Sequence, residues 1–221
     1  MQRPFFPTQA YLGYPNDDEE KELSLLERRR QYAVFARKLN TIFRSLLDDN
    51  YALHENLTVL TRKGFNGRKV EVDCVAVTSF GVFVVSHLQA TGYVNWGKTA
   101  NEIVAISESG VSRTVPCPIL QAAPAVQFLK ALFARRQCPV IPIAVVTHNA
   151  CDVDLSLSRA ILKVDELPYF LRQSFARFSV EDGNSLSVRD VSAWLRNGCQ
   201  KWEYANSGSK RCRTVRTVAG H

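Results

Sequence analysis

The sequence predicts an α/β fold in which a mixed β-sheet is flanked by helices. Two long stretches repeat apolar residues at three- and four-residue steps, which is typical of amphipathic helices. Short runs rich in Val, Ile and aromatic residues lie between and after them, bounded by Gly, Asn and Asp, which is typical of strands. The predicted order is helix, strands, helix, strand, helix, helix, and this order favours an α/β sandwich.

The first half of the chain is predicted to form a helix followed by an antiparallel meander. Apolar residues recur at helical spacing over residues 17–47, and the acidic residues of the first turn suit the positive end of the helix dipole. Three strands are then expected over residues 51–60, 70–77 and 82–88, joined by short turns that contain glycine. Two further short strands are expected over residues 93–96 and 102–106.

The second half adds helices and one buried strand. Residues 119–136 have an apolar stripe, with Pro118 placed where the first turn tolerates proline. Residues 140–146 are an almost continuous apolar run, which predicts a strand buried on both faces. Helices are expected over residues 165–175 and 187–204, the second beginning with a capping box of Ser187 and Asp190.

Length, composition and cysteine pattern restrict the class of protein. The chain has 221 residues, 46% of them hydrophobic, and no run of 18 apolar residues that would span a membrane. We expect one domain over residues 19–204, between an irregular arm over 1–18 and a basic, disordered tail over 205–221. The acidic N-terminus has no secretory h-region, and the six cysteines form no C-x-x-C pair. These features predict a cytoplasmic protein with reduced thiols and no membrane insertion.

The net charge of +7 favours an acidic partner such as nucleic acid. Much of this surplus lies in the tail, which makes the tail a candidate for non-specific phosphate contacts. The candidate nucleic-acid-binding residues are Lys210, Arg211, Arg213 and Arg216.

Two carboxylates on one predicted strand are the strongest chemical signal. Strand alternation is expected to place Glu71 and Asp73 on the same face, where two carboxylates could share a divalent cation. A glycine turn and the apolar strand Gly81-Val82-Phe83-Val84-Val85 follow directly. A polar strand face is the alternative interpretation of the same pattern.

This stretch resembles the nuclease-related domain (NERD) family of the PD-(D/E)XK nuclease-like superfamily. The resemblance covers about residues 35–175 and implies a restriction-endonuclease-like sandwich. It rests on the joint spacing of an E-x-D strand, a G-V-F-V-V strand, a following glycine and a Pro-x-x-Gln helix start. In this sequence those features are Glu71-Val72-Asp73, Gly81 to Val85, Gly92, and Pro118 to Gln121.

The departures from the family pattern fall on its catalytic positions. Where the family has E-x-K, this chain has Ser86-His87-Leu88. The resemblance implies that the family's acids hold Mg²⁺ and that its lysine supports the nucleophile, and neither Ser86 nor Leu88 can replace those charges. Asp73 and Gln121 would then be remnants of the site, and Glu71 with Asp73 at most a weak metal site. We expect no cofactor, with Mg²⁺ needed only if the protein is active.

Three functions remain open at this stage. The first is a catalytically degenerate nuclease-related domain, not an enzyme, that associates with nucleic acid, DNA in preference to RNA, or scaffolds a larger complex. The second is an active, divergent Mg²⁺-dependent nuclease that uses Glu71, Asp73 and a third ligand such as Glu102. The third is a protein-interaction module whose N-terminal arm, with Phe5, Phe6, Tyr11 and Tyr14, orders on contact with a partner.

Overall fold

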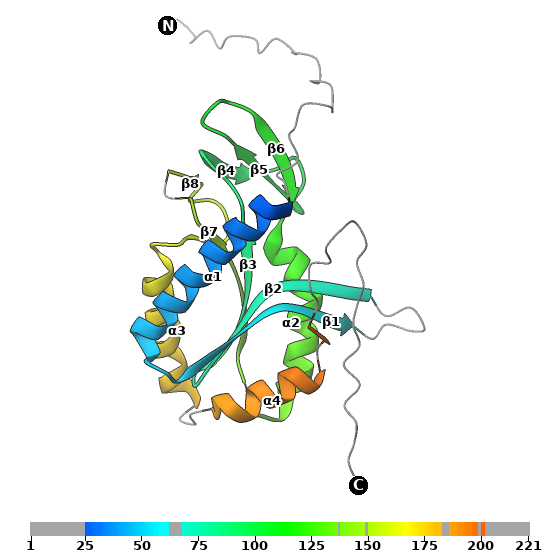
Figure 1. Cartoon of the computed structure of the whole chain (residues 1–221), viewed down its shortest axis with the longest axis vertical. Helices are drawn as coiled ribbons and strands as arrows, with labels where there is room; N and C mark the ends of the chain where they lie inside the picture. Colours follow the sequence, from blue (N-terminus) through cyan, green and yellow to red (C-terminus); the bar gives the residue numbers. More distant parts are fainter. Residues whose placement is uncertain are drawn as a thin grey trace, which may run out of the picture.

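A computed structural model of the chain describes residues 25–61, 68–136, 138–148, 150–182, 186–198 and 200–201 (Figure 1). The helices are α1 (Leu25–Leu47), α2 (Pro118–Phe133), α3 (Leu167–Asp182) and α4 (Val188–Gly198), with a 3-10 turn η1 (Ala134–Arg136) after α2. The strands are β1 (Tyr51–Thr61), β2 (Arg68–Thr78), β3 (Gly81–Leu88), β4 (Tyr93–Trp96), β5 (Glu102–Ile106), β6 (Ser112–Pro116), β7 (Val140–Val146), β8 (Asp152–Val153), β9 (Ile161–Lys163) and β10 (Gln200–Lys201).

The main sheet has six strands in the order β10-β1-β2-β3-β7-β9. The strands β1, β2 and β3 form the predicted antiparallel meander. The strand β7 then pairs parallel to β3, and β9 pairs parallel to β7. A parallel connection needs a crossover element, and α2 provides it between β3 and β7. The mixed sheet flanked by helices confirms the predicted α/β class.

Helices cover both faces of the main sheet (Figure 1). On one face, α1 and α3 contribute Phe35, Leu39, Phe43, Leu167 and Leu171 to a buried cluster with the side chains of β3 and β7. On the opposite face, α2 and α4 pack Val126, Leu129 and Leu195 against a second cluster of strand residues. Every strand of the meander is therefore buried on two sides near its centre, as expected for a sandwich.

A smaller four-stranded sheet, β6-β5-β4-β8, packs at the end of β3. Leu88, the last residue of β3, is buried together with Val94 and Ile103 of this sheet. Gly92, between the two sheets, has a φ of +75°, and a Cβ there would lie 2.3 Å from the carbonyl oxygen of Ile106. Only glycine tolerates both this positive φ and this close contact with the Ile106 carbonyl. This gives a physical reason for the glycine that the family pattern places after the G-V-F-V-V strand, here β3.

The structure corrects several boundaries of the predicted helices. The last predicted helix, over 187–204, ends at Gly198, and Gln200–Lys201 instead pairs with Leu57 and Thr58 at the edge of β1. The helix predicted over 165–175 begins at Leu167 and continues to Asp182. Sequence patterns did not predict β6, β8 and β9, which are short or mostly exposed and have little apolar periodicity. Residues 17–24 of the first predicted helix lie outside the described residues.

The predicted start of α4 is confirmed in part. The hydroxyl oxygen of Ser187 accepts a hydrogen bond from the backbone N–H of Asp190 at 3.3 Å, as the first half of a capping box requires. Among the helices in the described part of the chain, none is long and apolar enough to cross a bilayer.

Candidate functional site

The sheet and α2 enclose a polar pocket of about 610 Å³ at the start of β2. The pocket brings together four of the residues that the sequence singled out, Glu71, Asp73, Ser86 and Gln121. Leu88 is not among its lining residues. The complete lining is Lys69, Val70, Glu71, Val72, Asp73, Ser86, His87, Pro118, Gln121 and Ala122.

A kink in the meander sets the position of Asp73. Val72 packs in the cluster beneath α2, whereas Cys74, two residues on, packs in the cluster beneath α1. The regular alternation of side chains between the two faces of the sheet is therefore interrupted at Asp73. Asn56 lies across from Asp73 in the register of β1 and β2 and has a φ of +53°, which reverses the faces of β1 at the same level. Glu71 and Asp73 share one pocket, but simple alternation along β2, which the sequence analysis assumed, does not hold between them.

The Asp73 carboxylate is used within the fold. The antiparallel pairing of β2 and β3 ends at Cys74 and Val85. Beyond this pair, Oδ2 of Asp73 accepts a hydrogen bond from the backbone N–H of His87 at 2.8 Å. This bond takes the place of a backbone hydrogen bond between the two strands. The phenol of Tyr32 on α1 donates to the backbone carbonyl of Asp73 at 2.7 Å. The side chain thus closes the gap between two diverging strands.

Burial dominates the titration of Asp73. Loss of solvent raises the pKa of the carboxyl above its usual value of 3.8, and the negative charge of Glu71 raises it further. The hydrogen bond from the His87 N–H lowers the pKa and opposes these effects only in part. Glu71 itself is exposed at the pocket mouth. The two carboxylates therefore differ in environment although they are two residues apart.

The imidazole of His87 packs against α1 as a neutral ring. It stacks on Phe35 with ring centroids 4.5 Å apart and an angle of 7° between the planes. Its Nε2 lies 3.0 Å from Oγ1 of Thr147. Burial lowers the pKa of His87 from 6.5 to about 4. This packed environment leaves the ring unsuited to bind a metal in the pocket.

The two positions that differ from the family pattern have different surroundings. Ser86 is half-buried and lines the pocket, so the position where the resemblance implies an acid has a neutral hydroxyl here. Leu88 is 7% exposed and packs between the main sheet and the small sheet. An ammonium at position 88 would have to be buried among apolar side chains, at a large desolvation cost.

The donor set fits a divalent cation poorly. Mg²⁺ requires near-octahedral oxygen coordination, and one oxygen of Asp73 already accepts a backbone hydrogen bond. Across the described ranges, no group of three His, Cys, Asp or Glu side chains could hold a metal ion. Glu102, the suggested third ligand, lies on β5 of the small sheet and does not line the pocket. The pocket therefore contributes Glu71 and Asp73 without a third carboxylate.

Lys69 and Asn56 are the residues at this site that sequence reasoning missed. The exposed Lys69 lies two residues before Glu71 on β2 and adds a cation to the pocket lining. Its place in the E-x-D strand was visible in the sequence and could have indicated this. Asn56 gave no sequence signal, because it lies within a run that reads as an uninterrupted strand. Gln121 is exposed near the start of α2, and its backbone N–H donates to the Cys117 carbonyl at 3.0 Å.

The other candidate residues fall into two groups. The described cysteines are buried free thiols, Cys74, Cys117, Cys138 and Cys151. Burial raises the pKa of Cys138 to about 12 and also raises that of Cys151, which disfavours the reactive thiolate. Outside the described residues lie the tail residues Lys210, Arg211, Arg213 and Arg216 and the arm residues Phe5, Phe6, Tyr11 and Tyr14.

Comparison with known proteins gives one match. The family model of the nuclease-related domain matches residues 31–147, which run from the first half of α1 to the residue after β7. The matched segment contains the whole lining of the Asp73 pocket. No curated protein and no solved structure matches the chain.

Proposed function

The chain belongs to the nuclease-related domain family, and from this we propose that it is a catalytically degenerate member that associates with nucleic acid. In this proposal the protein does not cut its partner. It contributes a nuclease-like domain to a cytoplasmic complex, as a binding or scaffolding component, and DNA is the preferred nucleic acid. No cofactor is needed for this role.

The observation that carries the proposal is the structural use of Asp73. In a working metal site this carboxylate would be charged and directed at a cation, together with a second acid and a lysine. Here it accepts the His87 N–H at 2.8 Å, its pKa is raised by burial, and a serine stands at position 86. Removing one electrostatic stabiliser commonly costs about 10²–10³ in rate, so the loss of both an acid and a lysine favours a non-catalytic role.

A cleavage assay tests the proposal directly. The purified chain is incubated with plasmid, linear duplex and single-stranded DNA in Mg²⁺ and in Mn²⁺. We expect no cleavage above that of an Asp73→Ala variant purified in parallel. Robust cleavage that Asp73→Ala abolishes would establish the active, divergent nuclease instead.

A second assay separates nucleic-acid association from a role in protein interaction alone. Binding of the wild-type chain to labelled DNA is measured between about 50 and 200 mM salt, where phosphate contacts weaken steeply. We expect binding at low salt with a steep salt dependence. Absence of binding at 50 mM salt would refute the nucleic-acid role and favour the protein-interaction module.

A further inference from the structure

The outer face of α1 carries a row of arginines at seven-residue intervals. Arg30, Arg37 and Arg44 are all exposed. An α-helix turns about 100° per residue, so seven residues bring the chain back to within about 20° of the same direction. The row is therefore a single stripe, here called the arginine stripe, with about 10.5 Å between successive Cα atoms along the helix axis.

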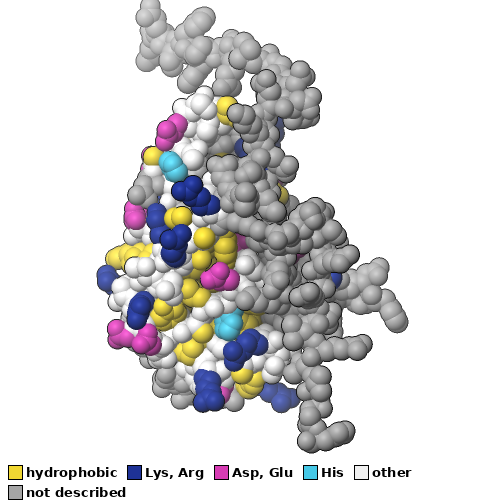
Figure 2. Space-filling view, viewed as in Figure 1, with side chains coloured by type: hydrophobic (Ala, Val, Ile, Leu, Met, Phe, Trp, Pro, Cys, Tyr) yellow, Lys and Arg dark blue, Asp and Glu magenta, His cyan; other side chains and the backbone are white. Residues whose placement is uncertain are grey.

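The stripe lies on the side of α1 that faces away from the core. Phe35, Leu39 and Phe43 are at most 1% exposed and hold the opposite side of the helix against the sheet. This buried row fixes the rotation of α1, so the arginines are held outward by the packing of the helix. Figure 2 shows dark-blue Lys and Arg side chains over α1 on this face. The stripe thus belongs to a rigid element of the fold.

The arginines of the stripe form no ion pairs within the described residues, although the exposed Asp48 and Asp49 follow the end of α1. The sequence has no Asp or Glu between Arg30 and Leu47. The Nε of Arg37 donates a hydrogen bond to the carbonyl of Ala33 at 3.2 Å, which aligns the guanidinium along the helix.

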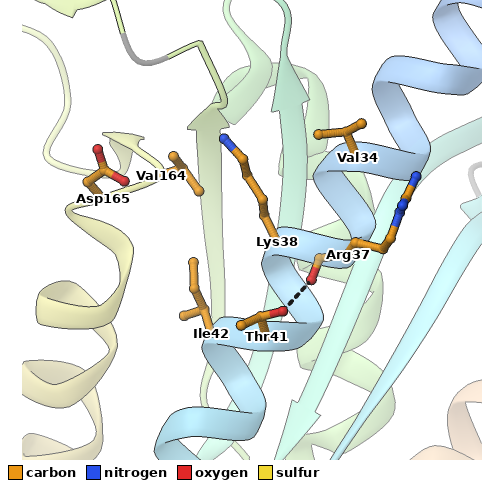
Figure 3. Close-up of a pocket in the computed structure, with 7 residues that line it drawn as sticks. All are labelled: Val34, Arg37, Lys38, Thr41, Ile42, Val164 and Asp165. Carbon is orange, nitrogen blue, oxygen red and sulfur yellow. Dashed lines mark hydrogen bonds between the residues drawn. The ribbon is translucent and has the colours of Figure 1, made fainter.

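A groove beside the stripe shows where the positive surface ends (Figure 3). It is lined by Val34, Arg37, Lys38, Thr41, Ile42, Val164 and Asp165. Lys38 extends into this groove towards Val164 and donates to the Thr147 carbonyl at 3.3 Å, whereas Arg37 extends from the other side of α1. Asp165 forms part of the groove wall. A negative partner is therefore favoured along the outer ridge of α1 and disfavoured towards the start of α3.

From these observations we infer that the arginine stripe is a binding surface for the phosphate backbone of a nucleic acid. Guanidinium groups bind phosphate through paired N–H donors, which is why arginine suits this role. The three arginines span about 21 Å along the axis of α1, which equals the axial rise of about six nucleotides of one duplex strand. This inference rests on the proposed function and locates the contact on the face opposite α2.

A nucleic acid fits this surface better than a membrane does. Membrane-bound helices insert an apolar face into the lipid, and the apolar face of α1 is already buried against the sheet. Over the part of α1 whose burial the structure describes, Val34 is the exposed large apolar side chain, at 41%. The exposed side of α1 therefore offers mainly charge, because its apolar side is already used in the core.

The experiment compares two triple variants of the full chain that lose the same charge. Arg30→Gln/Arg37→Gln/Arg44→Gln removes the stripe, and Arg135→Gln/Arg189→Gln/Arg196→Gln removes three exposed arginines that follow α2 or lie on α4. Both lower the net charge from +7 to +4. Binding to a labelled mixed-sequence duplex is measured by fluorescence anisotropy at several salt concentrations, with circular dichroism to confirm folding.

We expect the stripe variant to bind about a hundredfold or more weakly at 50 mM salt, with a salt slope reduced by about 2.7. The control variant should keep a slope close to that of the wild type. If the wild type binds and the stripe variant keeps its slope, the stripe inference is wrong while the proposed function stands. If the wild type does not bind DNA at all, the proposed function fails first. If the wild type does not bind DNA but binds anionic vesicles, and the stripe variant loses that vesicle binding, the stripe is a membrane-binding surface instead.

Discussion

The Asp73 pocket and the outer face of α1 are both charged regions, but they use their charge differently. In the pocket, Asp73 bonds to the His87 backbone and its pKa is raised by burial. On α1, three arginines are exposed, and within the described residues none of them forms an ion pair with a carboxylate. A polar side chain that is hydrogen-bonded inside the protein stabilises the fold, whereas an exposed charged side chain is available to bind a partner. The comparison therefore separates a region whose polar groups serve the fold from the region that we propose binds nucleic acid.

The largest expected effect tests the packing that orients α1. Phe35→Ala should lower the free energy of unfolding by about 3–5 kcal/mol, because it removes a buried ring and leaves a cavity beside His87. Urea unfolding measures the change. Arg37→Ala, two residues along on the exposed side, is the matched control and should change it by less than about 0.5 kcal/mol. Equal losses would mean that the two sides of α1 are not distinct.

The second prediction concerns the pH dependence of stability at His87. Burial lowers the pKa of His87 to about 4 in the folded protein, below the 6.5 of the free side chain. A lowered folded-state pKa stabilises the fold above pH 6.5, and this contribution is lost as the pH falls towards 4. The difference corresponds to up to about 3 kcal/mol. Urea unfolding of the wild type should therefore show a loss across this window.

His87→Gln isolates that contribution, because it removes the titrating ring and leaves the other carboxyl groups in place. The stability difference between wild type and variant should shrink as the pH falls from 6.5 towards 4. A difference that stays constant across this range would show that His87 is not buried in its neutral form.

The third prediction tests the structural role of Asp73. Asp73→Ala leaves the partly buried N–H of His87 without its acceptor and should cost about 1–3 kcal/mol of unfolding free energy. Asp73→Asn keeps an acceptor oxygen and should lose less. Glu71→Ala, on the exposed neighbour, should stay within about 0.5 kcal/mol of the wild type. An Asp73→Ala variant as stable as the wild type would contradict a structural role for this carboxylate.

The smallest expected effect concerns the stability of the stripe variant. Arg30→Gln/Arg37→Gln/Arg44→Gln changes exposed side chains, each of which should alter the free energy of unfolding by no more than about 0.5 kcal/mol. The midpoint of urea unfolding measures this. A cooperative loss of several kcal/mol would place the arginines among the groups that hold the fold together.

Much of the fold could be predicted from the sequence because its core elements have strong apolar periodicity. The meander, α2 and the buried strand β7 were predicted within a few residues of their observed bounds. The predicted end of α4 was wrong, since pairing of Gln200–Lys201 with β1 depends on distant residues that no local pattern records. Within the small sheet, β4 and β5 were predicted at their observed bounds, whereas β6 and β8 were not, because they depend on the same kind of tertiary contact.

The sequence indicated which residues lie at the candidate site but not how they are arranged there. Strand alternation pointed to Glu71 and Asp73, the family resemblance pointed to Ser86 and Gln121, and all four line one pocket. The environment of Asp73 could not be predicted, because it depends on a left-handed residue in the neighbouring strand. The exposed face of α1 was in the sequence as a row of arginines, yet its orientation depends on which side the sheet buries.

The left-handed Asn56 has a consequence for aggregation. β1 lies near the edge of the main sheet, where, among the described residues, β10 pairs with Leu57 and Thr58. A straight, uncovered edge invites a strand from another molecule to add by backbone pairing. At Asn56 the edge of β1 changes face, so an incoming strand that pairs along Tyr51–Glu55 would lose its register there. The kink that makes room for Asp73 thus also shortens the edge on which an amyloid-like contact could grow.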